Sequence, residues 1–344
     1  MKKVSISILL FPLVILFASL VADDQLDFVI EKSTPVWDVL EYLGEPLPNH
    51  QVNESVNDAS AEKGKDLMLI GITKKPKRGK TKKQSKHFVC TSCHNIQKED
   101  PDLRLSNPQS RLEYAAENGL PYLQGTTLFG AVNRTSFYNG DYEKKYGELV
   151  EPTRHDLRAA IQLCAVECSQ GRKMKDWEVE SVLMYLWTLE LKLEDLNLVN
   201  DDYDLIQDAV STFKGGKDEE TINYIQSFYQ NGSPAHFITP PENRDAGYGL
   251  IGSPENGKLI YDLSCMHCHE AKRYSFFELD NSAITFRYLK NNFTKYAHSS
   301  IYQVARYGTS PIPGKKAYMP QYTAEKMSDQ QLEDLRAYIE KMAE

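Results

Sequence analysis

The spacing of apolar residues predicts helices throughout the second half of the chain. One helix is expected from Pro254 into Cys265, with Ser253 as N-cap and Pro254 at the first helical position. A second is expected over 300–306. The last starts with Ser328 and Gln331 as a capping box. Its apolar stripe predicts burial of one face and consists of Leu332, Leu335, Tyr338, Ile339 and Met342.

The first half has a similar pattern with longer connections. Helices are expected over about 60–70, closed by Gly71, over about 153–168 and over about 176–193. A long, mostly polar loop is expected to run from after His94 through Gly140. The acidic and then Gly-, Pro- and Asn-rich stretch over about 201–249 predicts a partly helical connector.

The N-terminus has the pattern of an export signal. Lys2 and Lys3 form a basic start, an apolar run follows from Val4 to Phe17, and Ala22 ends it. We therefore expect a bacterial periplasmic protein, with the alternative that the segment stays as an uncleaved membrane anchor.

Length sets the number of domains, because 344 residues exceed one typical domain. The predicted fold class is all-α, with two domains joined by a connector. The expected bounds are 1–22 for the signal peptide, 23–198 for the first domain, 199–249 for the connector and 250–344 for the second domain.

Composition and charge exclude two broad classes. Apolar content of 41% with 26% charged residues can build a core, which excludes general disorder. A net charge of −8 argues against a general nucleic-acid binder. One stretch, 74–86, is locally basic. It holds eight positive charges without an acid: Lys74, Lys75, Lys77, Arg78, Lys80, Lys82, Lys83 and Lys86. It is interpreted as a docking site for an acidic redox partner, a steering site for an anionic substrate, or a solvated loop.

Four of the six cysteines lie in two Cys-x-x-Cys-His motifs. The first motif consists of Cys90, Cys93 and His94, and the second consists of Cys265, Cys268 and His269. Two thiols at this spacing form thioethers with the vinyl groups of one haem, and the following histidine binds the iron. The motifs therefore predict two covalently bound c-type haems. A zinc site or a disulfide is the alternative, but one Cys/Cys/His set at each distant position fits separate haems better.

The other axial ligand of each iron has its own candidates. Met319 lies in a Gly- and Pro-rich loop before the last helix, so it is the candidate for the second haem, with His298 as competitor. A methionine ligand raises the reduction potential. For the first haem Met174 is one candidate, and Cys164 and Cys168 are the cysteines outside the motifs. The alternative for both thiols is a buried, inert role or a disulfide at a helix end.

Around the first motif the chain resembles the dihaem thiosulfate dehydrogenases, which also act as tetrathionate reductases. The resemblance rests on the run from Val89 to His94, on Arg134 in a loop, and on Ile161, Cys164 and Gly171 before a closing helix. It covers residues of about 60–193. The second half resembles small class I cytochromes c in general. Both domains, 23–198 and 250–344, are therefore expected to be class I cytochrome c-like haem domains, joined by the connector.

This resemblance implies that Cys164 is the distal ligand of an active-site haem. A thiolate ligand lowers the haem potential, and a thiolate that leaves the iron can attack the sulfur of a substrate. Thiosulfate and tetrathionate are dianions, so their site needs cations. Arg134 and Arg158 are the expected catalytic cations, with Arg154, Arg172 and Lys173 as further candidates. The alternative for each arginine is a surface ion pair or a role as partner of a haem propionate.

Three functional hypotheses follow. The first is an oxidoreductase that interconverts thiosulfate and tetrathionate and passes electrons to an external cytochrome or oxidase. The second is an electron carrier whose first haem is saturated by Met174 or by one of the histidines His87, His155 and His236. The third is a dihaem peroxidase, which the absence of that class's characteristic loop motifs argues against.

Overall fold

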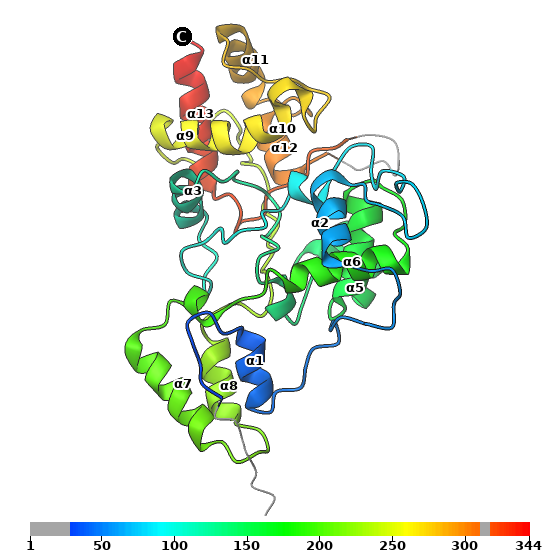
Figure 1. Ribbon diagram of the computed structural model, residues 1–344. Coiled ribbons are helices and arrows are strands. Elements are labelled where there is room, and N and C mark those ends of the chain that lie inside the picture. Colours follow the sequence, from blue (N-terminus) through cyan, green and yellow to red (C-terminus); the bar gives the residue numbers. More distant parts are fainter. Residues whose placement is uncertain (1–27, 310–316) are drawn as a thin grey trace, which may run out of the picture.

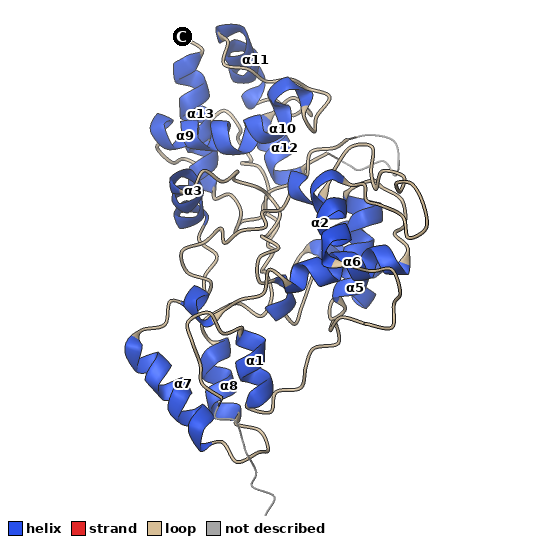
Figure 2. Ribbon diagram, viewed as in Figure 1, coloured by secondary structure: helices blue, strands red, loops and turns tan. Residues whose placement is uncertain are grey.

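The computed structural model describes residues 28–309 and 317–344. The expected signal segment, 1–22, and Pro311, Pro313 and Gly314 of the expected loop lie outside these residues. The described residues form helices and loops without a strand (Figure 2). Extended backbone pairs in them only as isolated β-bridges. The predicted all-α class is confirmed. No helix in the described ranges has the length and apolar content needed to cross a membrane.

Five α-helices form the second half. They are α9 (Pro254–Ile260), α10 (Met266–His269), α11 (Ala283–Phe293), α12 (Ile301–Tyr307) and α13 (Asp329–Met342). The π-helix Tyr261–Cys265 joins α9 to α10, and the 3₁₀ turn Glu270–Lys272 follows α10. Ser253 caps α9 by accepting a hydrogen bond from the backbone N–H of Asn256, and Ser328 and Gln331 form the predicted capping box. These predicted helix starts are confirmed.

The first half is built on α2 (Ala61–Ile70), α5 (Leu157–Leu163) and α6 (Asp176–Trp187). Ser60 caps α2, and Gly71 ends it with a φ of 72°, as expected. The helix expected to start at 153 starts later, because Asp156 is its N-cap, and it changes to a π-helix over Cys164–Cys168. The remaining short helices of this half are η1 (Cys90–Ser92), η2 (Ala131–Asn133), α4 (Tyr142–Tyr146), η3 (Gly147–Thr153) and η5 (Leu193–Leu196).

The same helix crossing occurs in both halves. In α2, a Cβ on Gly64 would lie 1.8 Å from the carbonyl oxygen of Ser181 in α6. In α9, a Cβ on Gly257 would lie 1.9 Å from the carbonyl oxygen of Asp334 in α13. Only glycine permits so close an approach of two backbones. In each half, therefore, a helix that precedes the Cys-x-x-Cys-His motif packs against a helix that follows it (Figure 1).

A third group of helices packs away from both motifs. It consists of α1 (Val36–Tyr42), α7 (Asn200–Thr212) and α8 (Glu219–Gln226), at the bottom of Figure 1. The buried residues Leu40, Ile206 and Ile225 belong to its core. The stretch expected to be a connector thus holds two helices with their own hydrophobic core, completed by a segment near the start of the described chain.

The expected polar loop before Gly140 contains a further helix, α3 (Pro108–Glu117). Asn107 caps it and Pro108 occupies its first turn, which is a sequence signal for a helix start. Leu112 and Tyr122 are fully buried in the core of the second half. The backbone N–H of Tyr122 also donates to the carbonyl oxygen of Leu263, at 2.9 Å. The two halves are therefore packed together through this segment.

Candidate functional site

The first motif holds its histidine in one orientation. His94 Nδ1 lies 2.7 Å from the carbonyl oxygen of Thr126, and because a carbonyl only accepts, Nδ1 carries the proton and donates it. Nε2 is then the free nitrogen, as an iron ligand requires. A Cβ on Gly125 would lie 2.6 Å from His94 Nδ1, so only glycine fits beside the ring.

The second motif repeats this arrangement. His269 Nδ1 donates to the carbonyl oxygen of Phe277 at 2.8 Å, which again leaves Nε2 as the free nitrogen. Both histidines are therefore oriented by a backbone carbonyl that follows them in the chain.

A cavity of about 250 Å³ lies beside the first motif. Cys90, Cys93 and His94 line it, together with apolar side chains such as Leu67 and Val182. A mostly apolar cavity with two thiols and an oriented imidazole on its wall fits a covalently attached haem. Cys90, Cys93 and His94 are the residues that would hold it.

The candidate distal ligands line the same cavity. Cys164 and Cys168 reach it from the π-helix, and Met174 reaches it from the loop before α6. None of the three histidines considered as alternatives lines it: His155 bonds to the carbonyl oxygen of Thr135, His236 pairs with Glu325, and His87 packs on Phe276. The choice of ligand therefore lies among two thiols and one thioether.

Cys168 has polar partners inside the cavity. The hydroxyls of Tyr146 and Tyr138 lie 3.3 Å and 3.6 Å from its Sγ. The hydrogen bond from Cys164 lowers the pKa of the Cys168 thiol to about 6 against the effect of burial, and the two tyrosines act in the same direction. The pKa of Cys164 moves the other way, because its thiol is the donor in that pair.

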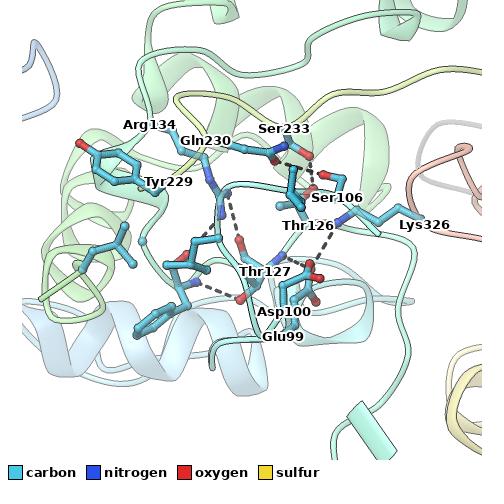
Figure 3. Close-up of a pocket in the computed structure, with 15 residues that line it drawn as sticks. Glu99, Asp100, Ser106, Thr126, Thr127, Arg134, Tyr229, Gln230, Ser233 and Lys326 are labelled. Atoms are coloured by element: carbon cyan, nitrogen blue, oxygen red, sulfur yellow. Dashed lines mark hydrogen bonds and ion pairs between the residues drawn. The ribbon is translucent and has the colours of Figure 1, made fainter. Parts of the chain in front are cut away.

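Three cations line the cavity: Arg134, Lys145 and Lys326. Arg134 donates to the carbonyl oxygens of Thr127 and Phe129, at 3.0 Å and 3.2 Å, and burial lowers its pKa to about 10. Arg134 and Lys326 also line a smaller polar pocket of about 50 Å³ (Figure 3). These two cations therefore stand between the large cavity and the small pocket.

The other predicted cations do not reach the cavity. Arg158 is bound by Glu180 at 2.9 Å and by the carbonyl oxygens of Asn49 and Gln51. Arg154 pairs with Glu143, and Arg172 pairs with Glu178. Neither these three nor Lys173 is among the residues that line it. The prediction that Arg158 faces the substrate is therefore not supported, because its guanidinium is already paired.

Met319 is fixed beside the second motif. Its backbone N–H donates to the hydroxyl of Thr309, and its carbonyl oxygen accepts from the backbone N–H of Thr309, each at 2.8 Å. The side chain packs on the core of the second half, where Cys265 also packs. The competitor His298 is exposed on the surface. These positions favour Met319 over His298 as the distal ligand.

Comparison with known families identifies the second half. Residues 252–339 match the family model described as cytochrome C oxidase, cbb3-type, subunit III. This region is a c-type cytochrome domain. Neither the curated proteins nor the solved structures include a significant match to the chain. A cytochrome domain of this kind holds a covalent c-type haem and transfers electrons, so the second motif is its attachment site.

The cytochrome domain lies directly against the first motif. Cys268 Sγ is 4.0 Å from the carbonyl oxygen of Ser92, which stands between the two thiols of the first motif. Tyr318 and Pro320 line the first cavity, while Met319 between them packs in the cytochrome domain. The two motifs therefore lie next to each other.

Sequence reasoning missed Lys145, Lys326 and the tyrosines of the first cavity. Tyr138, Tyr142 and Tyr146 recur at intervals of four, a spacing that predicts one helix face and could have been noticed. Lys326 had no local signal, because only tertiary packing brings it from the cytochrome domain to the first cavity.

Proposed function

We propose that the chain is an exported dihaem cytochrome that interconverts thiosulfate and tetrathionate at the first motif and transfers electrons through the cytochrome domain. The observation that carries this proposal is the shared cavity, in which Cys164 and Cys168 meet Cys90, Cys93 and His94. An ordinary electron carrier has no need for two further thiols in such a place. Three cations in the same cavity suit a dianionic substrate.

The reaction balances with the groups proposed. Two thiosulfate dianions lose one electron each and join through a new sulfur–sulfur bond, which gives tetrathionate. A haem supplies a one-electron acceptor, so two haems in one chain accept the pair. No proton is consumed or released.

The residues of the chain have separate roles in this proposal. Cys164 is the distal ligand, as the resemblance to the dihaem thiosulfate dehydrogenases implies, and its thiolate keeps the potential of the first haem low. Lys145 provides the cation for the substrate, since it lines the cavity and its ammonium donates to a neutral partner, Gln321 Oε1, at 3.2 Å. Arg134 and Lys326 add positive charge from the wall of the cavity.

The second motif would provide the exit for electrons. The 4.0 Å separation between Cys268 Sγ and the carbonyl oxygen of Ser92 supports direct transfer between the two sites. Met319 would raise the potential of a haem held at the second motif, and this would make the transfer run downhill.

We place the external redox partner at the basic loop 74–86. None of its eight positive residues forms an ion pair with any residue in the described ranges. These positive side chains could therefore pair with acidic residues of a cytochrome or oxidase domain. Binding of such a partner should weaken as the salt concentration increases. The basic and apolar pattern of the N-terminal segment supports a periplasmic location for this encounter.

A dihaem electron carrier is the second candidate, and one observation favours it. Met174 lines the first cavity, and Gln162 fixes its backbone through hydrogen bonds of 2.8 Å and 2.9 Å. A thioether held in this way is a suitable iron ligand, and a His/Met haem without an open position would serve only as a relay.

The identity of the distal ligand separates the two candidates. Electron paramagnetic resonance of the oxidised holo-protein should show thiolate ligation in the wild type and in Met174→Leu, and lose it in Cys164→Gly. Loss of the native signal in Met174→Leu alone would support the carrier and overturn the sulfur-chemistry proposal.

A further inference from the structure

One peptide group connects the histidine of the first motif to a buried carboxylate. The carbonyl oxygen of Thr126 accepts the Nδ1–H of His94 at 2.7 Å. The N–H of the same peptide unit, on Thr127, donates to Glu99 Oε1 at 2.9 Å. His94, the 126–127 peptide and Glu99 therefore form one continuous hydrogen-bonded chain.

Glu99 is held in place from several sides. Its side chain is 2% exposed, and Arg111 and Lys326 pair with it at 3.2 Å and 3.3 Å. Asn95 Nδ2 donates to its other oxygen at 3.0 Å. Burial raises the pKa of the Glu99 carboxyl, but Arg111 and Lys326 bring it well below its usual range. The carboxylate is therefore ionised. Figure 3 shows Glu99 beside Thr127 and Lys326 at the small polar pocket.

We propose that Glu99 is a positioning residue that lowers the reduction potential of the first haem by acting through the 126–127 peptide on His94. A carboxylate at the N–H end of a peptide polarises it and makes its carbonyl oxygen a stronger acceptor. A stronger acceptor draws the Nδ1 proton and increases the electron donation of the imidazole through Nε2. Increased donation stabilises oxidised iron over reduced iron, so the potential falls.

The second motif offers a comparison within the same molecule. His269 Nδ1 donates to the carbonyl oxygen of Phe277, and the N–H of that peptide unit belongs to Glu278. In the described residues this N–H makes no hydrogen bond to a carboxylate. The Glu278 side chain is 53% exposed and pairs with Lys272. A buried carboxylate therefore acts on His94 and not on His269. The potential of the first haem is lowered relative to that of the second, which drives electrons from the first to the second.

The chain of contacts also crosses between the halves. Lys326 lies in the cytochrome domain, directly before α13, and its ammonium is bound to Glu99 of the first half. The arrangement around His94 therefore depends on the docking of the cytochrome domain.

The inference requires a haem at the first motif, but it holds whether or not the substrate is thiosulfate. The haem content of each purified variant, measured as pyridine haemochrome, comes first and should be two per chain. The midpoint potentials of both haems are then measured by spectroelectrochemistry at pH 8.5 in the wild type, Glu99→Gln, Glu99→Asp and Asp100→Asn.

Asp100 is the matched control, because it is the next residue in the chain and lines the same small pocket, whereas the N–H of Thr127 donates to Glu99. Burial raises its pKa to about 7, so at pH 8.5 it carries the same charge as Glu99. Asp100→Asn therefore removes an equal charge without touching the peptide.

The expected result is an upward shift of the first potential in Glu99→Gln, a smaller upward shift in Glu99→Asp, and an unchanged second potential in both. Aspartate keeps the charge and shortens the reach, so it also tests the inference if the glutamine variant does not fold. The ¹⁵N shift of His94 Nδ1 in the reduced protein should move in the same order. An unchanged first potential in both Glu99 variants, or an equal shift in Asp100→Asn, would overturn the proposal.

Discussion

His94 Nδ1 lies 2.7 Å from the carbonyl oxygen of Thr126, and the corresponding histidine of the cytochrome domain is held in the same way at 2.8 Å. A bond of this kind fixes both the tautomer and the ring orientation of an iron ligand. Its presence at both motifs supports the proposal that the first motif also holds a haem; the family match covers residues 252–339.

The first prediction concerns haem number. The mature holo-protein should contain two haems, and replacing both cysteines of one motif by alanine should leave one, since each pair attaches its own group. Intact mass and pyridine haemochrome content measure this directly. The double variant with Cys164→Ala and Cys168→Ala is the control, and it should keep two haems. A single haem in the wild type would contradict the prediction.

The second prediction concerns Met319. Met319→Gly should lower the potential of the second haem by on the order of 0.1 V, because loss of the thioether removes a ligand that favours reduced iron. Redox titration of the second haem checks this. Met327→Leu, in the same buried core, and His298→Ala, on the surface, are the controls. A shift in His298→Ala with none in Met319→Gly would reverse the assignment.

Gly125 should be essential for the first haem only. In Gly125→Ala the new Cβ would meet His94 Nδ1 at 2.6 Å and the carbonyl oxygen of Cys93 at 2.5 Å, so the ring or the backbone must move. We expect a loss of about 1 to 3 kcal/mol in unfolding free energy and an altered spectrum of the first haem. The second haem, measured in the same sample, provides the reference. A wild-type spectrum at both haems would show that the space beside His94 is not restrictive.

Asp100 should make stability depend on pH. Its folded pKa is raised to about 7 by burial, so between about pH 4 and pH 7 the folded state binds more protons than the unfolded state, and stability falls as pH rises. Asp100→Asn removes this loss. The variant should gain on the order of 2 kcal/mol over the wild type at pH 8 and much less at pH 4. Urea unfolding at both pH values measures the difference, and an equal gain at both would refute the assignment.

Local signals predicted the parts of the fold that depend on local chemistry. The caps at Ser253 and Ser328 and the helix end at Gly71 were predictable, because capping needs only a few neighbouring residues. The predicted helix start at 153 was wrong, because Asp156 is the N-cap. The pattern of apolar residues does not distinguish a start at 153 from one at 157.

Long-range packing decided what the sequence could not show. The core around Leu40 and Ile225 joins segments far apart in the chain. The sequence of 201–249 does not indicate that its helices pack against α1. For the site, the motifs and the thiols were visible from spacing and composition. Of the cations, Arg134 was predicted and lines the cavity, whereas Lys145 and Lys326 were missed. The predicted Arg158 is paired with Glu180, and Lys326 reaches the cavity from the other half.

The most direct test of the account is an anaerobic titration of the oxidised holo-protein with thiosulfate, with Cys164→Gly and Met174→Leu measured in parallel. The account predicts reduction of two haems per chain in the wild type and in Met174→Leu, with one tetrathionate formed for each pair of electrons, and no reduction in Cys164→Gly. If thiosulfate leaves the wild type oxidised, and tetrathionate leaves the reduced protein reduced, the chain is not a thiosulfate or tetrathionate enzyme and the electron-carrier reading replaces it.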